Sequence, residues 1–140
     1  MKKVFIQGTF DLLNYGHTMA FRDAKAQGDY LIVGLNTDEL VREYKHREPI
    51  LPFWQRKIIL ESIRWIDEVV PANTFSPMQL LIDMDIDVYA IGSEWKASKV
   101  KEVNYMKRKG GSVIYTPEYP GVIHSSEIRT RCVAQSQQKP

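Results

Sequence analysis

Short apolar runs alternate with amphipathic stretches along the 140-residue chain. Runs that are rich in β-branched and aromatic residues and bounded by Gly, Pro, Asn or Asp are typical of strands. We predict strands at residues 3–7, 30–35, 67–70, 88–91 and 112–116. Most of these runs are continuously apolar, which favours strands that are buried on both faces of a sheet.

The segments between the predicted strands have the spacing of helices. Residues 53–64 are the clearest case, because Ile58, Ile59, Leu60 and Ile63 form one apolar face. Asn36 or Thr37 is a suitable cap for the helix that follows the second strand, and Gly28 ends the first helix. We predict helices at 17–27, 37–44, 53–64, 77–84, 100–109 and 125–134, and a disordered polar tail at 135–140.

Regular alternation of strand and helix predicts an α/β fold, a Rossmann-like three-layer sandwich with a five-stranded parallel sheet. The chain has no repeat and no linker, so residues 1–134 are expected to form a single domain. Ligands of such sheets bind beyond the carboxyl ends of the strands. The segments that begin at Gly8, Asn36, Gly92 and Tyr119 all follow strands, and we expect them to meet at one sheet edge.

Composition narrows the choice of partners. The 19 basic and 17 acidic residues are mixed and give a net charge of +2, so nothing indicates nucleic acid. No apolar run has membrane-spanning length, and no membrane partner is expected. The single Cys132 excludes an intramolecular disulfide and suits a reducing compartment. We therefore expect a cytoplasmic protein.

Residues 8–17, with the sequence GTFDLLNYGH, follow the first apolar run directly. A strand that enters a glycine-bearing turn and then a helix presents free N–H groups and the positive end of the helix dipole. Gly8 and Gly16 allow a ligand to approach the backbone closely. His17 lies where a cationic or hydrogen-bonding imidazole stabilises charge on a phosphate. The pattern favours a bound polyphosphate.

This segment resembles the GTFDxLHxGH signature of the cytidylyltransferase family of small nucleotidyltransferases, and most closely its glycerol-3-phosphate-specific group. Four further segments resemble motifs of that family in the same order. They are residues 36–39 (NTDE), 56–69 with the run RWIDEV, 92–95 (GSEW) and 121–128 (GVIHSSEI). The resemblance therefore covers nearly the whole chain.

The resemblance implies that a phosphorylated small-molecule acceptor attacks CTP, which releases pyrophosphate and forms a CDP-linked product. It also implies Mg²⁺, associated with Asp11, and a homodimer. Implied catalytic residues are His17, Asn14, Arg47 and Lys45, and implied acceptor-binding residues are Asp38 and Arg64. The implied nucleotide-binding residues are Gly8, Thr9, Phe10, Asp11, Gly16, Arg56, Gly92, Ser93, Glu94, Trp95, His124, Ser125 and Ser126.

The chain departs from the family pattern at three places. Asn14 replaces the first His of the signature, and an amide cannot become cationic. His124 is unexpected in the last motif, and we hypothesise that it supplies part of the missing charge. Residues 118–120 replace an Arg that holds the acceptor phosphate in the family, which predicts an acceptor other than glycerol 3-phosphate. Two alternatives stay open, namely adenylyl transfer from ATP and a catalytically silent CTP-binding protein.

Overall fold

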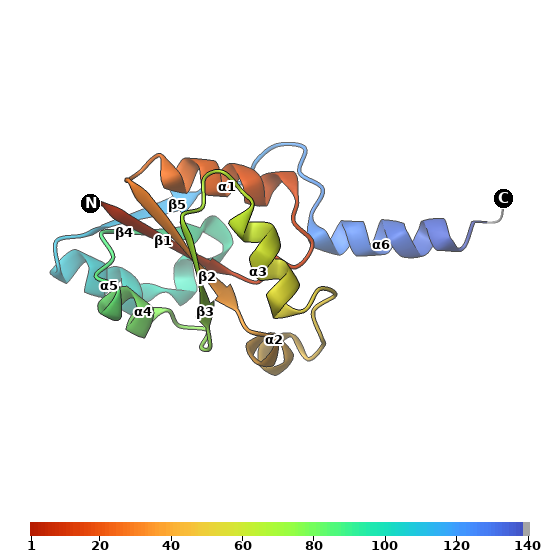
Figure 1. Ribbon diagram of the computed structural model, residues 1–140, viewed down its shortest axis with the longest axis horizontal. Helices are drawn as coiled ribbons and strands as arrows, with labels where there is room; N and C mark the ends of the chain where they lie inside the picture. Colours follow the sequence, from red (N-terminus) through yellow and green to blue (C-terminus); the bar gives the residue numbers. More distant parts are fainter. Residues whose placement is uncertain (139–140) are drawn as a thin grey trace.

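Five parallel strands form one sheet in the computed structural model, which describes residues 1–138 (Figure 1). The strands pair in the order β3-β2-β1-β4-β5, so the strand order reverses at β1. This arrangement confirms the predicted fold class. The bounds of the strands are β1 (Lys3–Gly8), β2 (Tyr30–Asn36), β3 (Glu68–Ala72), β4 (Val88–Gly92) and β5 (Ser112–Thr116).

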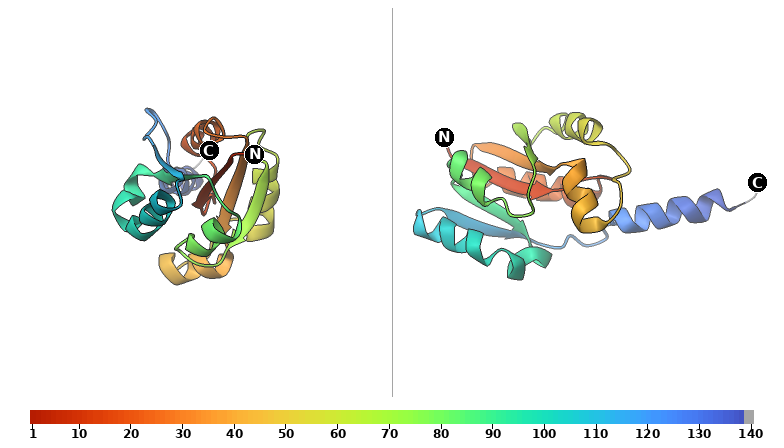
Figure 2. Two further views of the ribbon diagram at one scale, coloured as in Figure 1. Left: turned by 90° about the vertical axis from the view of Figure 1, so that its left-hand side faces the viewer. Right: turned by 90° about the horizontal axis from the view of Figure 1, so that it is seen from below.

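Successive strand residues point to opposite faces of the sheet, and each face is covered by helices (Figure 2). Val4 and Ile6 of β1 pack on one side in a cluster that includes α1 (Tyr15–Lys25) and α3 (Phe53–Glu61). Phe5 packs on the other side in a cluster that includes α4 (Met78–Asp83) and α5 (Val100–Arg108). The two apolar clusters hold β1 rigidly at the centre of the molecule.

Element boundaries differ from the sequence predictions where local chemistry decides them. Helix α1 begins at Tyr15, earlier than predicted, because the Asn14 side chain caps it. Thr37 caps α2 (Asp38–Lys45) as expected. Strand β3 continues through Pro71 to Ala72, beyond the predicted end at residue 70. Because β3 is an edge strand, the missing N–H of Pro71 costs no hydrogen bond within the sheet.

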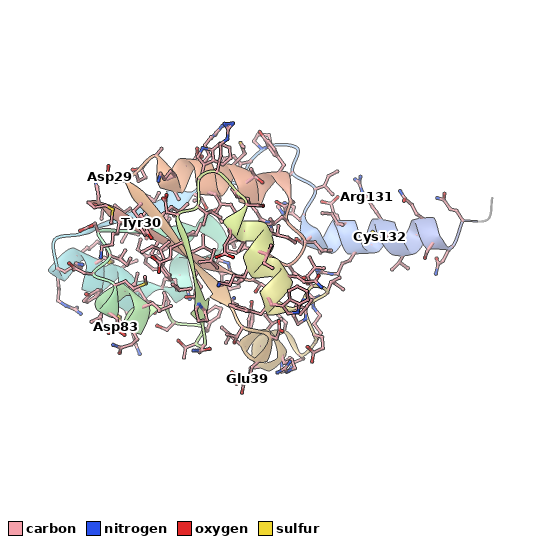
Figure 3. All side chains as sticks on the ribbon, in the orientation of Figure 1. Asp29, Tyr30, Glu39, Asp83, Arg131 and Cys132 are labelled. Atoms are coloured by element: carbon pink, nitrogen blue, oxygen red, sulfur yellow. The ribbon has the colours of Figure 1, made fainter. Side chains whose placement is uncertain are left out.

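Helix α6 (Ser125–Ser136) extends away from the rest of the molecule, and only its first turn lies against the sheet edge (Figures 1 and 2). It contains no buried residue, and Arg131 and Cys132 project into solvent (Figure 3). The helix runs to Ser136, beyond the predicted end at residue 134. Residues 139–140 of the predicted disordered tail lie outside the described residues.

A short 3-10 helix, η1 (Ser93–Ser98), follows β4 and was not predicted. It carries Glu94 and Trp95 over the carboxyl edge of the sheet. Among the described residues, no helix has both the length and the apolar character that crossing a bilayer requires.

Candidate active site

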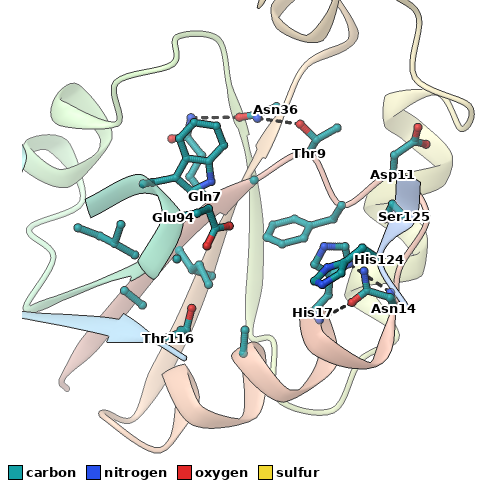
Figure 4. A pocket seen from close by; sticks show the side chains of 18 of the residues that line it. Gln7, Thr9, Asp11, Asn14, His17, Asn36, Glu94, Thr116, His124 and Ser125 are labelled. Atoms are coloured by element: carbon teal, nitrogen blue, oxygen red, sulfur yellow. Dashed lines mark hydrogen bonds between the residues drawn. The ribbon is translucent and has the colours of Figure 1, made fainter. Parts of the chain in front are cut away.

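A cavity of about 370 Å³ opens at the carboxyl ends of β1, β2, β4 and β5 (Figure 4). Segments that are far apart in the sequence meet there, as predicted from the topology. Lining residues that carry polar groups or aromatic rings are Gln7, Thr9, Phe10, Asp11, Asn14, His17, Asn36, Tyr44, Lys45, Phe75, Tyr89, Glu94, Trp95, Lys99, Thr116, His124, Ser125, Ser126 and Arg129.

The turn between β1 and α1 is built around Phe10, whose φ of 47° lies in the left-handed region. The Phe10 ring folds back over Gly8, where a Cβ atom would lie only 2.6 Å from it. The same ring meets the His17 imidazole edge-on, with centroids 5.3 Å apart. Gly8 is therefore required for packing, and Phe10 fixes the plane of the His17 ring.

Asn14 and His17 form a reciprocal capping box at the start of α1. The Asn14 Oδ1 accepts the His17 backbone N–H at 3.0 Å, and the His17 Nδ1 accepts the Asn14 backbone N–H at 3.2 Å (Figure 4). Because Nδ1 accepts a hydrogen bond, the ring proton of neutral His17 lies on Nε2. Asn14 thus acts as a helix cap, and His17 offers one N–H donor to the cavity.

The charge state of His17 follows from its surroundings. Burial, together with the neighbouring His124 and Lys45, lowers the pKa of His17 from 6.5 to about 4. The imidazole is therefore neutral near pH 7, and it acts through a hydrogen bond rather than a positive charge. Positive charge at this end of the cavity comes from Lys45 and Arg129.

The first turn of α6 forms the opposite wall. The Ser125 Oγ donates to the Leu12 carbonyl at 2.6 Å and ties α6 to the β1–α1 turn. His124 is the N-cap residue, but no side chain caps this end. The first N–H groups of a helix have no partner within the helix. Those of α6 are therefore available to a ligand in the cavity, beside His124, Ser126 and Arg129.

The loop after β4 forms the third wall. The carboxylate of Glu94 lies against Gly92, where a Cβ would come within 2.9 Å of it. Trp95 is 44% exposed and meets the Phe75 ring edge-on with centroids 5.5 Å apart. These side chains offer a flat apolar surface and a hydrogen-bond acceptor next to each other. Ser93 is exposed on η1 and does not line the cavity.

Arg56 lies behind the cavity, which corrects the predicted nucleotide contact to a structural role. Its side chain is 1% exposed and donates to the carbonyls of Thr9, Asn36 and Leu51 at 2.8–2.9 Å. It also pairs with the Asp38 carboxylate at 2.6 Å. Asp38 in addition accepts the Phe53 N–H, so both of its oxygens are engaged outside the cavity. Asp38 lies outside the cavity lining, and its contact with the acceptor stays a prediction.

Asp11 lines the cavity but is used by the backbone of a neighbouring loop. Its two oxygens accept the N–H groups of Ile50 and Leu51 at 2.7 and 2.8 Å. Within the described residues, no group of three His, Cys, Asp or Glu side chains is arranged to hold a metal ion. The described residues therefore form no metal site from protein ligands alone, and the association of Mg²⁺ with Asp11 stays a prediction.

The other predicted residues divide between the cavity and the surface. Lys45 lines the cavity at the end of α2, with its ammonium 5.6 Å from the centre of the Tyr44 ring. Arg47 is exposed in the loop that follows, outside the lining. Arg64 is exposed beyond α3 and lies over the Trp65 ring at 5.3 Å. Gly16 packs against Val122 rather than facing the cavity.

Several lining residues were not predicted. Gln7 and Asn36 are polar residues at the ends of apolar strands, and that position was a usable signal. Thr116 ends β5 in the same way. Tyr44 and the buried Lys99 belong to no recognised motif. Neither gave a local signal, because a sequence does not reveal which side chains turn inward. Arg129 follows the last motif by one residue and was overlooked.

Comparison with known proteins points to one family. Residues 5–131 match the sequence profile described as cytidylyltransferase-like. The chain is 42% identical over 117 residues to the glycerol-3-phosphate cytidylyltransferase of Staphylococcus aureus, covering 79% of this chain and 88% of that protein. It is 38% identical over 123 residues to the enzyme of the same name from Bacillus subtilis, covering 87% and 91%.

A solved structure supports the fold independently. The lipopolysaccharide core biosynthesis protein of Thermoplasma volcanium superposes with a TM-score of 0.75 at 21% identity. The match covers 85% of this chain and 98% of that chain. At this identity the likeness concerns the fold alone.

Proposed function

Because the chain belongs to the cytidylyltransferase-like family, we propose that it transfers CMP from CTP to a phosphorylated small-molecule acceptor. The observation that carries this proposal is the convergence of three different walls on one cavity. These are the neutral His17 donor, the uncapped N-terminus of α6, and the Glu94–Trp95 surface. The His17 donor and the N-terminus of α6 would bind a triphosphate, and the Glu94–Trp95 surface would bind a base.

In the proposed reaction, a phosphate oxygen of the acceptor attacks the α-phosphorus of CTP in line. The bond from that phosphorus to the bridging oxygen breaks, and pyrophosphate leaves with the electron pair. Negative charge grows on the oxygens around the phosphorus in the transition state. A preformed N–H donor such as His17 Nε2 stabilises that charge without reorganisation. Catalysis then rests on positioning and charge stabilisation, without a covalent intermediate on the enzyme.

Three cationic or ionisable groups surround the proposed triphosphate site. Lys45 and Arg129 line the cavity from α2 and α6, and His124 stands between α6 and His17. We assign them to the phosphate oxygens, where charged donors bind about twice as strongly as neutral ones. Ser125 and Ser126 lie where the first-turn N–H groups of α6 receive a phosphate. Mg²⁺ is proposed to be held by the triphosphate oxygens themselves.

The base is assigned to the loop after β4. Trp95 supplies a stacking surface, and Glu94, whose carboxylate lies against Gly92, accepts a hydrogen bond from the cytosine amino group. Replacing Trp95 with Ala should weaken CTP binding by about 1–3 kcal/mol, the range for stacking of a base on an aromatic ring. Acceptor affinity should change much less.

Pyrophosphate release from the purified protein tests the function. CTP and ATP are each supplied with a panel of phosphorylated sugars, polyols, amino alcohols and amino acids. Release with CTP and an acceptor supports the proposal, whereas release only with ATP identifies an adenylyltransferase. CTP binding without release under any acceptor identifies a silent nucleotide-binding protein.

We also propose a cytoplasmic homodimer. Helix α6 has no buried residue, and an isolated helix of this length is marginal in water. Trp54 and Ile58 of α3 are 61% and 58% exposed. A second copy of the chain would cover such surfaces, and the molar mass in solution tests this. The single exposed Cys132 fits a reducing compartment.

A further inference from the structure

The loop that joins β5 to α6, residues 117–124, runs beside α1 and contacts it (Figure 1). We call this segment the β5–α6 loop. Near the start of α1, Val122 packs on Gly16, where a Cβ atom would lie 3.1 Å from the Val122 methyl groups. Directly after the loop, the Ser125 Oγ donates to the Leu12 carbonyl at 2.6 Å. These contacts bring the first turn of α6 to the cavity.

Tyr119 attaches the other end of the β5–α6 loop to α1. Its hydroxyl donates to Oδ2 of Asp23, a residue 96 positions away in the sequence. This hydrogen bond lowers the pKa of Asp23, and burial together with the Asp23 carboxylate raises the pKa of Tyr119. At pH 7 the acceptor is therefore an ionised carboxylate and the donor is a neutral phenol. Charge-assisted hydrogen bonds of this kind are roughly twice as strong as neutral ones.

Helix α6 depends on the β5–α6 loop for its direction. None of the helix residues is buried, so within the described part of the chain no core packing holds α6 against the sheet. The hydrogen bond of Ser125 fixes one point of the helix, and a helix held at one point is free to pivot. The attachment at Tyr119 restricts that pivoting, because Pro120 limits the backbone freedom of the loop directly after it.

We propose that Tyr119 is a positioning residue for the phosphates of the nucleotide. Its hydrogen bond to Asp23 sets, through the β5–α6 loop, the direction of the first N–H groups of α6 and the place of His124. Tyr119 and Asp23 lie outside the cavity lining, so they act through α6 and not by touching the ligand. Donors that are already in place cost less ordering entropy when a ligand binds. This inference rests on the proposed function, which supplies a triphosphate as the ligand of α6.

Tyr119→Phe tests the role directly, because it removes the hydroxyl and keeps the ring. The apparent Kd of a ligand rises as the fraction of protein with a correctly placed α6 falls. We expect the Kd for CTP, measured by calorimetry, to rise about five- to tenfold on loss of one hydrogen bond to a charged group. The affinity for cytidine, measured by NMR titration, should not change, because cytidine carries no phosphate and its base is assigned to the loop after β4.

Tyr115→Phe is the matched control. Tyr115 lies on β5, is 37% exposed and is outside the cavity lining, so the same atom is removed from a nearby position on the surface. This variant should leave the affinities for both CTP and cytidine unchanged. Circular dichroism checks that the two variants are folded under the conditions of the binding measurements.

Variants of Asp23 show whether the hydrogen bond itself is responsible. Asp23→Ala removes the acceptor and should raise the Kd for CTP as much as Tyr119→Phe does. Asp23→Asn keeps an oxygen that accepts from Tyr119 and should recover most of that loss. Both substitutions break the exposed ion pair between Arg22 and Asp23, so the difference between them does not come from that pair. Combining Tyr119→Phe with Asp23→Ala should add little to either change, because both remove the same bond.

The inference is overturned if Tyr119→Phe binds CTP as tightly as the natural protein, if CTP and cytidine are weakened equally, or if Asp23→Asn behaves like Asp23→Ala. If the natural protein binds ATP in place of CTP, ATP and adenosine replace the two ligands in the same comparison. A natural protein that binds neither nucleotide refutes both the inference and the proposed function.

Pyrophosphate release by the natural protein separates the two proposals in the remaining cases. Release together with an unchanged CTP affinity in Tyr119→Phe would support the reaction and refute the positioning role. A selective loss of CTP affinity in Tyr119→Phe, without release by the natural protein, would support the positioning role and refute the reaction.

Discussion

Two helices present their N-termini to the same cavity, but they do so in opposite ways. Helix α1 begins with the Asn14–His17 capping box, in which Asn14 Oδ1 accepts the backbone N–H of His17. Helix α6 has no side-chain cap. The first helix therefore contributes a single oriented imidazole, and the second contributes free backbone donors. We infer that the triphosphate lies on α6 and that α1 serves to aim His17.

This contrast explains how Asn fits at position 14. Asn is among the best N-cap residues, and its Oδ1 is engaged by the His17 backbone N–H at 3.0 Å. The Asn14 side chain caps the helix but cannot become cationic, and the His17 tautomer is set by the backbone N–H of residue 14. Positive charge is then required from the opposite wall, where His124 and Arg129 line the cavity.

Removing the aimed imidazole should have the largest effect. His17→Ala should reduce kcat by about a hundredfold or more, the usual scale for one transition-state donor. His46→Asn is the control, because it removes an exposed imidazole outside the cavity at a φ of 55° that Asn tolerates. Turnover by pyrophosphate release measures both. Near-normal turnover in His17→Ala would refute the division of roles between the two helices.

The neutrality of His17 predicts a pH-dependent stability. Its pKa in the folded protein is about 4, below 6.5 in the unfolded chain. Neutral His17 therefore contributes about 3 kcal/mol to the free energy of unfolding. This contribution is complete above pH 6.5 and is lost as the pH falls toward 4. Urea unfolding at several pH values should show this loss in the natural protein and not in His17→Gln. Parallel curves for the two proteins would mean that the pKa of His17 is the same in the folded protein and in the unfolded chain.

The proposed position of the triphosphate is tested on α6 itself. Arg129→Gln should raise the Kd for CTP by about 10- to 100-fold, the effect of losing a charged hydrogen bond. Arg131→Gln is matched on the same helix, where Arg131 is exposed and pairs with Glu127 at 3.6 Å. It should leave the Kd unchanged. Equal effects of the two variants would indicate a general electrostatic contribution and no defined contact with α6.

The sequence predicted the parts that depend on local chemistry. Strands such as 88–91 stand out because continuous β-branched and aromatic residues suit a sheet buried on both faces. The Gly8–His17 turn was found from its glycines and its place after a strand. Pro71 was misread because the sequence does not show which strand lies at an edge. Whether a strand is central or at an edge depends on pairing between distant segments.

Charged residues were the least predictable part of the site. Arg56 was expected at the nucleotide from the family resemblance, yet it is buried and donates to three backbone carbonyls. Lys99 belongs to a lysine-rich segment and was not among the predicted site residues, yet it is buried and lines the cavity. In both cases the direction of the side chain is decided by packing against residues far away in the sequence. Composition and spacing carry no information about that choice.

The smallest expected effect concerns whether His124, at the start of α6, supplies the positive charge that Asn14, at the start of α1, cannot carry. His124 is the N-cap residue of α6, lines the cavity, and its charge contributes to the lowered pKa of His17. His124→Ala should reduce kcat by about tenfold, which corresponds to about 1.4 kcal/mol. Adding Asn14→His should recover part of that loss, because the second imidazole returns a group that takes up a proton more readily beside the negative charge of the triphosphate.

A double-mutant cycle on kcat measures the coupling between Asn14 and His124 directly. We expect a coupling of about 1 kcal/mol, near the lower part of the range for residues that share one ligand. Each variant is compared at a temperature where its unfolding curve shows the folded state, because Asn14→His also alters the cap of α1. Strict additivity would show that the two walls act independently. Asn14 would then be a cap alone, and His17 with Lys45 and Arg129 would account for the stabilisation of the transition state.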